Sequence, residues 1–505
     1  MKTYLNNAFS FLFIIAFIFS SQSCTNDALF VEAILATEPE SEPPVDPVTN
    51  EDPVPVENPS STFKIPEGSY YVTVSGKSTN DGLSEANAWD IEYAFSNAKA
   101  GDYVFIKSGN YGNIELRVKN PGTSSEPLRF IGYTSTPGDI IAEQGSTFKY
   151  GDQVDPNVMP LLQATRTNNE GNGNAINISQ PYVEISNFQI KNYISGLSSY
   201  GEYNVVNNII VVEVGDFNPA HSYPTGTSNA FLNYNGIGIA FNGEFSTLKN
   251  CFVLNSGSEG YRFYEAQNQT HSYNQVYSDN NINPTDYYYL FSTGSSNNEI
   301  SNIHVERIGN LEHGGHGLVL KTLDVNNNNF YDCLIKNTNV ELSYSGVKNN
   351  SFIRCKIIGG DDGDGGLSIA NGANNNSFIN CVISNNQGVM FADWDETVSL
   401  GDVKNAGHNN KFFQCEIKDM IGGVNFYWYS VQNSEIYAND NIFEECTFSN
   451  LDNLFIVDRA NLNTKFINCS VVNVKKLRDS YYPTIHSSIP LNIVHQNTTY
   501  ENSDF

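Results

Sequence analysis

Short segments in which apolar and polar residues alternate recur along the chain after residue 235. They read GIGIAF, GYRFYE, YYYLFS, GLVLKT, NVELSY, GLSIAN, GVMFAD, GVNFYW and NLFIVD. A period of two is the pattern of a β-strand with one buried face. Asn, Gly and Ser turns separate the segments, and no helical periodicity intervenes. The pattern therefore predicts a series of short strands joined by turns.

A second recurring segment ends in cysteine. It reads LKNC, FYDC, FIRC, FINC, FFQC, FEEC and FINC, and its cysteines are Cys251, Cys333, Cys355, Cys381, Cys415, Cys446 and Cys469. Val276 and Ile303 take the cysteine position in two further copies, so the copies follow one another at intervals of 22 to 34 residues. Two strands per repeat at such a period indicate a solenoid of parallel strands.

The chain resembles right-handed parallel β-helix proteins of the pectate-lyase-like kind. Its segment YYVTVSGKSTNDGLSEANAWDIEYAFSNAKAGDYVFIKSGNY resembles the opening of many such proteins, where a short helix covers the first rung. The resemblance covers roughly residues 68 to 475. It implies an all-β, single-stranded right-handed parallel β-helix solenoid with an N-terminal capping helix, here at about 90 to 99.

The cysteines occupy one position of the repeat, so we expect them to form an inward stack. Rungs of a parallel sheet lie about 4.8 Å apart, and thiols in register point the same way. That arrangement fits the disulfide torsion poorly, so the stack should be reduced and buried. The asparagine runs NNNN, KNN, NNN and HNN that precede the cysteine segments are expected to form stacked turns, because Asn tolerates turn dihedrals and its amide can bond to the next copy.

The first 61 residues differ in composition from the rest. Residues 1–23 read as a secretory signal peptide with an apolar run from Ala8 to Phe19. SQSC resembles a bacterial lipobox with Ser21 at the usual aliphatic position, which predicts lipidation of Cys24; the alternative is a secreted or periplasmic protein. Residues 24–61 form a tether rich in Pro and acidic residues. We expect an outer-membrane or cell-surface lipoprotein whose domain spans 62–505, with a cap at about 68–100, clear rungs at about 180–475 and a tail at 476–505.

The charge of the chain excludes one class of partner. The formal net charge is −28 and the isoelectric point is about 4.5. The field of the whole molecule therefore repels nucleic acids. No apolar run after the signal peptide is long enough to span a bilayer. We expect a monomer that touches the membrane through its lipid anchor alone.

Outward positions of the first strand set carry the candidate chemistry. If the residue after each initial Gly points inward, alternation sends the second and fourth residues outward. The outward residues on neighbouring rungs then include Arg262, Tyr264, Tyr289, Lys321 and Glu341, within roughly 14 Å. Aromatic faces suit sugar rings and cations suit acidic groups, so this cluster predicts saccharide binding, with Asn425 and Tyr427 further along the same face.

A second column is expected at the residue before each strand, where Glu259, Asp286 and His316 would stack. Carboxylates and a histidine in one place can hold Ca²⁺ or change the pKa of Lys321. Calcium is therefore the one cofactor considered.

These residues suit β-elimination in a uronate polymer. That reaction removes the proton alpha to a carboxylate, which requires a base and a cation in one place. Lys321 is the candidate base, Arg262 or Ca²⁺ the carboxylate clamp, and His313 and His316 candidate proton shuttles or donors to the leaving oxygen.

The segment HGGHGLVLKTLDVNNNNFYDC is similar to one in polysaccharide lyase family nine, where a strand carries the catalytic lysine. The resemblance implies that Lys321 is the base and places His316 where that family has Asp. Family six lyases also use a Lys with an Arg on a β-helix face, but their Arg-His pair one rung later is replaced here by ELSYSG. We therefore predict a surface protein that cleaves an acidic polysaccharide.

Two alternatives stay open. A glycoside hydrolase would use Asp361, Asp362 or Asp393 with Asp395 as paired carboxylates. A binding protein without catalysis would use aromatic side chains, namely Tyr264, Tyr289, Tyr427 and Trp428.

Overall fold

A computed structural model describes most of the chain after Thr62. The described residues are 63–167, 171, 173–218, 236–280, 282, 284–309, 315–360, 366–385, 387–393, 405–427, 437–503 and 505. Contacts divide the chain into the units Met1–Thr62 and Phe63–Phe505. The predicted signal peptide, the lipidation site Cys24 and the tether lie outside the described residues. Over the described part, no helix is both long and apolar enough to cross a membrane.

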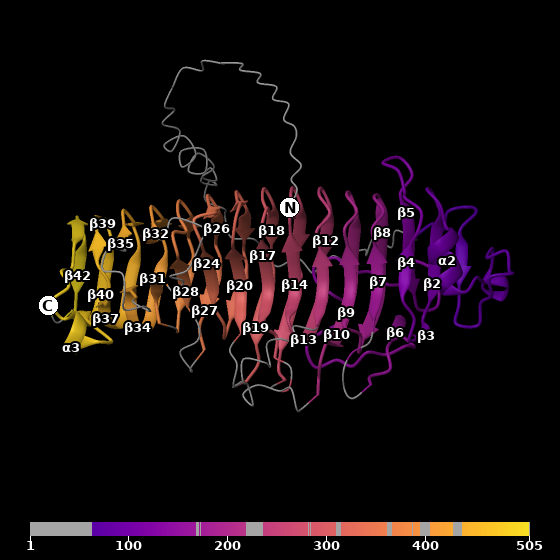
Figure 1. Ribbon diagram of the computed structural model, residues 1–505, viewed down its shortest axis with the longest axis horizontal. Coiled ribbons are helices and arrows are strands. Elements are labelled where there is room, and N and C mark those ends of the chain that lie inside the picture. The colour runs from indigo at the N-terminus through magenta and orange to yellow at the C-terminus, as the bar shows by residue number, and fades with distance from the viewer. Residues whose placement is uncertain are drawn as a thin grey trace, which may run out of the picture. The chain divides into compact units, whose positions relative to one another are not determined.

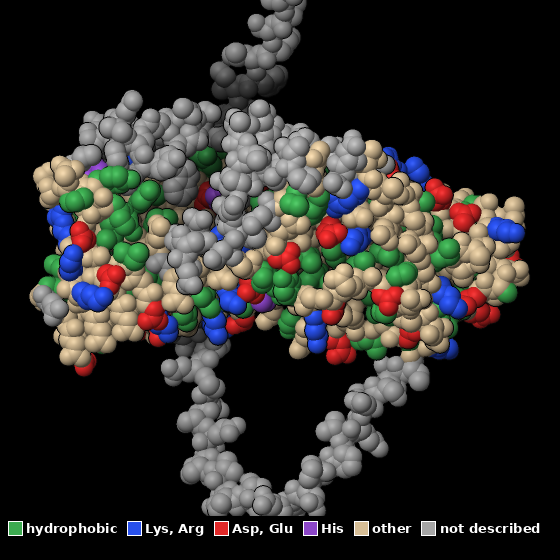
Figure 2. All heavy atoms as spheres, turned by 90° about the horizontal axis from the view of Figure 1, so that it is seen from below, with side chains coloured by type: hydrophobic (Ala, Val, Ile, Leu, Met, Phe, Trp, Pro, Cys, Tyr) green, Lys and Arg blue, Asp and Glu red, His purple; other side chains and the backbone are tan. Residues whose placement is uncertain are grey.

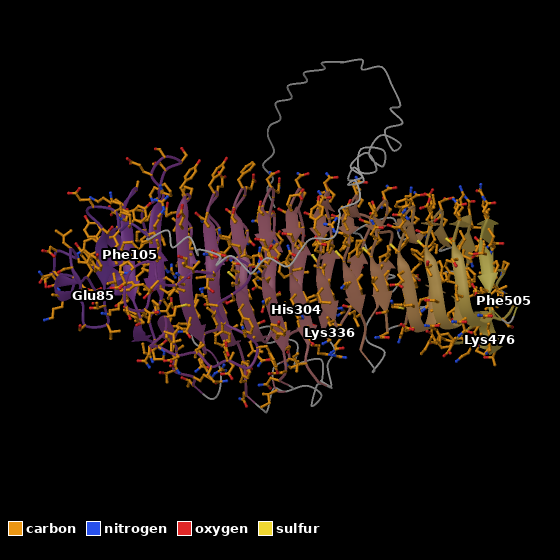
Figure 3. The ribbon with its side chains drawn as sticks, turned by 180° about the vertical axis from the view of Figure 1, so that it is seen from behind. Glu85, Phe105, His304, Lys336, Lys476 and Phe505 are labelled. Atoms are coloured by element: carbon orange, nitrogen blue, oxygen red, sulfur yellow. The ribbon has the colours of Figure 1, made fainter. Side chains whose placement is uncertain are left out.

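The Phe63–Phe505 unit is a parallel β-helix, as the repeat pattern predicts. Nearly all its strands belong to one sheet of 37 strands, and every strand pairing is parallel. The chain winds through three stacks of strands, rung after rung along one axis (Figure 1). Figure 3 labels Glu85 and Phe105 near the first rungs and Lys476 and Phe505 at the last.

Stack A carries the candidate outward residues of the sequence. It consists of β4 (Leu116–Val118), β7 (Asn174–Ile178), β9 (Ser195–Ser199), β11 (Ile237–Phe241), β14 (Glu259–Tyr264), β17 (Tyr287–Ser292), β20 (His316–Lys321), β24 (Val340–Ser343), β28 (Leu367–Ala370), β31 (Val389–Ala392) and the last parts of β34 (Glu416–Phe426), β37 (Thr447–Val457) and β40 (Ser470–Asp479).

Stack B comes after stack A in each rung. It consists of β1 (Tyr70–Val72), β2 (Tyr103–Lys107), β5 (Leu128–Tyr133), the first parts of β8 (Val183–Lys191) and β10 (Val205–Val214), β12 (Thr247–Lys249), β15 (Thr270–Ser272), β18 (Glu299–Ser301), β22 (Asn329–Tyr331), β26 (Ser351–Ile353), β29 (Ser377–Ile379), β33 (Lys411–Phe413), β36 (Ile442–Glu444), β39 (Thr464–Ile467) and β41 (Ile493–Gln496).

Stack C completes the rung. It consists of β3 (Gly109–Gly112), β6 (Pro160–Gln163), the last parts of β8 and β10, β13 (Phe252–Ser256), β16 (Gln275–Ser278), β19 (His304–Arg307), β23 (Leu334–Lys336), β27 (Lys356–Ile358), β30 (Val382–Ser384), the first parts of β34, β37 and β40, and β42 (Thr499–Glu501). Shorter strands lie at the corner between stacks A and B, namely β21 (Val325–Asn326), β25 (Val347–Lys348), β32 (Asn405–His408), β35 (Tyr437–Asn439) and β38 (Asn461–Leu462).

Asparagine ladders hold the corner between stacks A and B. The Asn328 amide donates to Asn350 at 2.9 Å, Asn350 to Asn376 at 3.0 Å and Asn376 to Asn410 at 3.1 Å, and all four are buried. The residue before each, such as Asn349 with φ 56°, adopts the left-handed conformation that Asn tolerates better than most residues. The prediction of stacked turns is confirmed.

The inward positions form continuous ladders. The rings of Phe330, Phe352, Phe378 and Phe412 stack in stack B with centroids 4.7 to 4.8 Å apart. All seven cysteines that the repeat predicts are free and buried. The reduced cysteine stack is therefore confirmed.

The predicted capping helix is also present. Helix α2 (Ile91–Asn97) begins after Asp90, whose carboxylate accepts from the backbone N–H of Tyr93 at 2.7 Å. Its buried Phe95 stacks on Phe130 of β5 at 4.1 Å. The other helical segments among the described residues are the 3-10 turn η1 (Glu85–Asn87) and α3 (Pro483–His486).

Candidate functional site

The start of three neighbouring strands in stack A gathers titratable side chains. Glu259, Tyr287 and His316 are equivalent in register, as the first residues of β14, β17 and β20. The predicted column of Glu259, Asp286 and His316 is therefore wrong at its middle member, because Tyr287 stands where Asp286 was expected. Asp286 lies one residue earlier and is buried.

The outward placement of Tyr289 is wrong. Tyr289 pairs with Tyr261 and Leu318, points into the core and is fully buried. The cause is a slip of one residue in aligning YYYLFS with GYRFYE, and such a slip moves every side chain to the opposite face. Leu290 and Ser292 take the positions expected for Tyr289 and Phe291. Tyr289 therefore has no part in binding a substrate.

Lys321 reaches across to the preceding rung. Its ammonium nitrogen Nζ donates to the Tyr287 hydroxyl at 2.7 Å and lies 4.3 Å from the centroid of the Tyr287 ring. Both side chains are partly exposed. Burial raises the pKa of Tyr287 well above its ordinary value, and the charges of Asp286, Glu341 and Glu259 raise it further. The phenol is therefore protonated and adjacent to the amine.

His316, at the start of the same strand as Lys321, also contacts Tyr287. The two rings stack with centroids 5.2 Å apart and planes 17° apart. His316 Nδ1 lies 3.0 Å from Glu341 Oε2, and the Glu341 carboxylate is buried. Burial lowers the pKa of His316, but the bond to Glu341 and the charges of Glu341 and Asp286 outweigh it and raise the pKa above its ordinary value. Glu341, expected to bind substrate, instead pairs with His316.

Glu259 and Arg262 complete the cluster on β14. Burial raises the pKa of Glu259, as does the charge of Asp286, while Ser258, Arg262 and Lys321 oppose the rise. Arg262 is partly exposed and close enough to Glu259 to act on its charge. Among the described residues, no group of three or more His, Cys, Asp or Glu side chains is placed to hold a metal ion.

The remaining predicted binding residues differ in exposure and in distance from this cluster. Tyr264, at the end of β14, is exposed as expected. Asn425 is fully buried, and its amide donates to the carbonyl of Gln387, so its predicted contact with substrate is wrong. Tyr427 comes directly after β34, four strands along stack A from β20, or roughly 19 Å. His313 lies outside the described residues.

Of the carboxylates proposed for a hydrolase, Asp393 is the one that the structure describes. Asp393 is buried and forms an ion pair with Arg459, which is buried as well. A carboxylate held in this way is occupied by its partner. Asp361, Asp362, Asp395 and Trp428 lie outside the described residues.

Tyr287 is the residue that sequence reasoning missed. The sequence did contain evidence for it, in the run of three tyrosines from Tyr287 to Tyr289. Aligning Tyr289 with the inward Tyr261, rather than with Arg262, would have brought Tyr287 beside Glu259. An aromatic residue is equally compatible with either face, so alternation did not choose between the two alignments.

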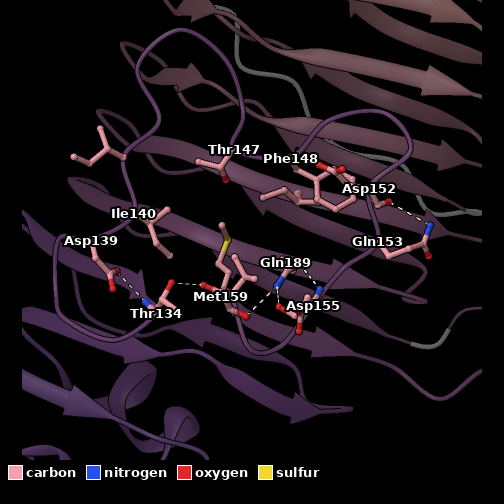
Figure 4. Close-up of a pocket in the computed structure, with 13 residues that line it drawn as sticks. Thr134, Asp139, Ile140, Thr147, Phe148, Asp152, Gln153, Asp155, Met159 and Gln189 are labelled. Carbon is pink, nitrogen blue, oxygen red and sulfur yellow. Dashed lines mark hydrogen bonds between the residues drawn. The ribbon is translucent and has the colours of Figure 1, made fainter.

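A separate pocket lies over stack C. It has a volume of about 510 Å³ and is roofed by residues 134–159 (Figure 4). Its polar groups are already bonded: Asp139 accepts from the backbone N–H of Thr134 at 2.9 Å within the loop, and Gln189 of β8 donates to the carbonyl of Met159 at 3.0 Å. The pocket is thus lined by groups that already fasten the loop to the sheet.

The outer faces carry charges of both signs. Figure 2 shows acidic and basic side chains lying close together over the rungs, with apolar side chains between them. In stack C, Glu306 accepts from Lys336 at 2.7 Å and from His304 at 2.8 Å, and Figure 3 labels His304 and Lys336, which lie on neighbouring strands. The Tyr277 hydroxyl lies 3.3 Å from His304 Nδ1, so this group contains the same kinds of side chain as the Lys321 cluster, which differs in lying on stack A beside Arg262.

The chain matches no protein-family model, and no curated protein matches it in sequence. Similar solved structures include a lacto-N-biosidase from Eubacterium ramulus, 13% identical over 86% of this chain and 67% of that chain, with a TM-score of 0.33. XylC in complex with xylose is 9% identical over 86% of each chain, with a TM-score of 0.39. The pectate lyase Pel9A is 11% identical over 86% of this chain and 79% of that chain, with a TM-score of 0.28. Similarity at this level decides nothing about the reaction, which rests on the residues of this chain.

Proposed function

We propose that the protein cleaves an acidic polysaccharide by β-elimination, with Lys321 as the base. The observation that best supports the proposal is the position of the Lys321 amine on the outer face, 2.7 Å from the Tyr287 hydroxyl and on the same face as Arg262. The deprotonated form of Lys321 acts as the base.

The chemistry explains why this combination of groups favours a uronate substrate. The C5 proton of a uronate is acidic because the carboxylate beside it can take up charge as an enolate. A cation next to that carboxylate stabilises the developing charge. Arg262 supplies a guanidinium that can hold a carboxylate with two hydrogen bonds. A neutral sugar has no group that requires such a cation.

Tyr264 supports binding of a sugar chain beside this centre. It lies on the same strand as Arg262, is exposed, and pairs in register with Ser292, the neighbour of Lys321. An exposed aromatic side chain offers apolar contact to a sugar ring. The binding residues of the proposal are therefore Arg262 and Tyr264.

The same proposal places the enzyme outside the cell. The signal peptide and the lipobox-like SQSC at Cys24 favour an exported lipoprotein, attached through a tether rich in Pro. Attachment at the cell surface suits a substrate too large to cross a membrane. Calcium at Glu259 and Asp286 stays a prediction, which activity measured with and without a chelator would test.

Glycoside hydrolysis is the second candidate, and one observation favours it. Burial and the charge of Asp286 raise the pKa of Glu259, and a carboxyl with a raised pKa close to a second carboxyl group is an arrangement that glycoside hydrolases use. Hydrolysis would leave new reducing ends without a double bond in the product. Analysis of the product therefore distinguishes hydrolysis from elimination.

The test is incubation of the protein with a panel of polyuronates, with measurement of the ultraviolet absorbance of the unsaturated uronate and of reducing ends. Absorbance that increases with reducing ends supports the lyase. Lys321→Ala should abolish it, while Lys348→Ala, which removes an exposed lysine on β25, should not. Reducing ends without absorbance would show hydrolysis, and full activity of Lys321→Ala would refute the assignment of the base.

A further inference from the structure

The contact between Lys321 and Tyr287 places two proton-transfer groups on one side of any bound sugar. They come from the neighbouring strands β20 and β17, and 2.7 Å separates Nζ from the hydroxyl oxygen. Two groups in hydrogen-bond contact cannot reach opposite faces of one sugar ring. Whatever each does to a substrate, both act on the same face.

Tyr287 is held in this orientation by its neighbours. The His316 ring stacks on it at 5.2 Å, and His316 is itself anchored by Glu341 at 3.0 Å. Lys321 contacts both the hydroxyl and the ring face. A phenol held by these contacts keeps its hydroxyl group at a fixed position, which proton transfer in a transition state requires.

We propose that Tyr287 is the catalytic acid that protonates the leaving oxygen, and that the elimination is therefore syn. The inference rests on the proposed function. Lys321 takes the C5 proton, a double bond forms between C4 and C5, the C4–O bond breaks, and the Tyr287 proton passes to the departing oxygen. The products are an unsaturated uronate and a free hydroxyl, and no other reactant is consumed.

The same contact restores the enzyme after each turnover. Lys321 then carries the proton from C5, and Tyr287 is a phenolate. Transfer across their hydrogen bond returns both groups to their starting forms without solvent. The raised pKa of Tyr287, caused by burial and by Asp286, Glu341 and Glu259, favours this return.

Syn elimination selects the substrate class by stereochemistry. In 4-linked mannuronate and glucuronate, the C5 hydrogen and the C4 oxygen lie on the same face of the ring. In galacturonate and guluronate they lie on opposite faces, which calls for a base and an acid on opposite sides. The geometry therefore points to polymers with the mannuronate or glucuronate configuration.

The first experiment compares four substrates: polymannuronate, a glucuronan, polyguluronate and polygalacturonate. We expect unsaturated product from one or both of the first two, and rates at least tenfold lower with the others. Cleavage of polyguluronate or polygalacturonate with no reaction of the first two would overturn the syn assignment but leave the lyase in place. No unsaturated product from any of the four would instead remove the proposed function.

The second experiment isolates the acid with Tyr287→Phe. Loss of general acid catalysis should lower kcat on the polymer by about 10² to 10⁴. A uronate with a nitrophenyl ether at C4 has a leaving group that needs no proton, so Tyr287→Phe should cleave it at close to the native rate, whereas Lys321→Ala should not. Tyr331→Phe, on β22 of stack B, is the matched control. Equal losses of Tyr287→Phe on both substrates, or no loss on the polymer, would refute the role.

Discussion

Acid should weaken this fold through one buried histidine, His271. It lies on β15 inside the β-helix and is fully buried. Its Nδ1 lies 3.0 Å from the Tyr289 hydroxyl and its Nε2 2.8 Å from Gln269 Oε1, while Phe263 and Phe291 flank the ring. Both ring nitrogens are satisfied with the imidazole neutral, and burial lowers the pKa of His271 to about 3.

The sign and size of the effect are set by linkage. The unfolded chain binds a proton at His271 below about pH 6.5, whereas the folded chain does so near pH 3. The neutral histidine therefore contributes its full stability above about pH 6.5, and the contribution is lost as the pH falls toward 3. At about 1.36 kcal/mol per pKa unit, the loss between pH 6.5 and pH 4 amounts to roughly 3 kcal/mol.

The assay is urea unfolding at pH 7 and pH 4, monitored by circular dichroism, for the native protein and for His271→Gln. The amide keeps a donor and an acceptor in the core but does not titrate. We expect the stability lost on going from pH 7 to pH 4 to be smaller in the variant by roughly 3 kcal/mol. The carboxylates titrate alike in both proteins, so their contributions cancel when the two stability losses are subtracted. His495→Gln, at the exposed end of the same ladder, should show a smaller difference, and an unchanged pH dependence in His271→Gln would refute the reasoning.

Three further predictions concern the ladders and the site. Phe378→Ala removes a buried ring between two stacked partners, so the free energy of unfolding should fall by about 3 to 5 kcal/mol in the same urea assay; a loss below about 1 kcal/mol would contradict the continuous stack. The rung cysteines are buried, and burial raises the pKa of Cys251 to about 12, so a thiol reagent should leave all seven unmodified in native buffer and modify them in urea; rapid native modification would speak against the reduced core ladder. Glu341→Gln should lower the pKa of His316, measured by NMR titration, because the carboxylate that stabilises the imidazolium is lost; an unchanged pKa would show that the ion pair does not form in solution.

Much of the fold could be predicted from the sequence because every rung repeats the same environments. A large apolar residue three places before each cysteine faces the same core ladder, and asparagine occupies the same left-handed corner, as at Asn349 and Asn375. Because the same pattern recurs in many copies, each copy supports the interpretation of the others. The strands, the cysteine stack and the capping helix could therefore all be predicted from the sequence.

The candidate site depends on residues that depart from the repeat pattern. For these residues, only the tertiary structure shows which side chains lie together. A slip of one residue in aligning YYYLFS determined whether Tyr289 points outward or into the core, and the tyrosines of that segment are compatible with either alignment. The bond from Lys321 to Tyr287 joins residues 34 positions apart, because stacking places successive rungs in contact. Asn425 and Glu341 have polar side chains in outward positions, yet one is buried and the other is paired with His316. Sequence spacing determines which residues share a face, but distances between side chains and the partners that occupy them arise only when neighbouring rungs pack together.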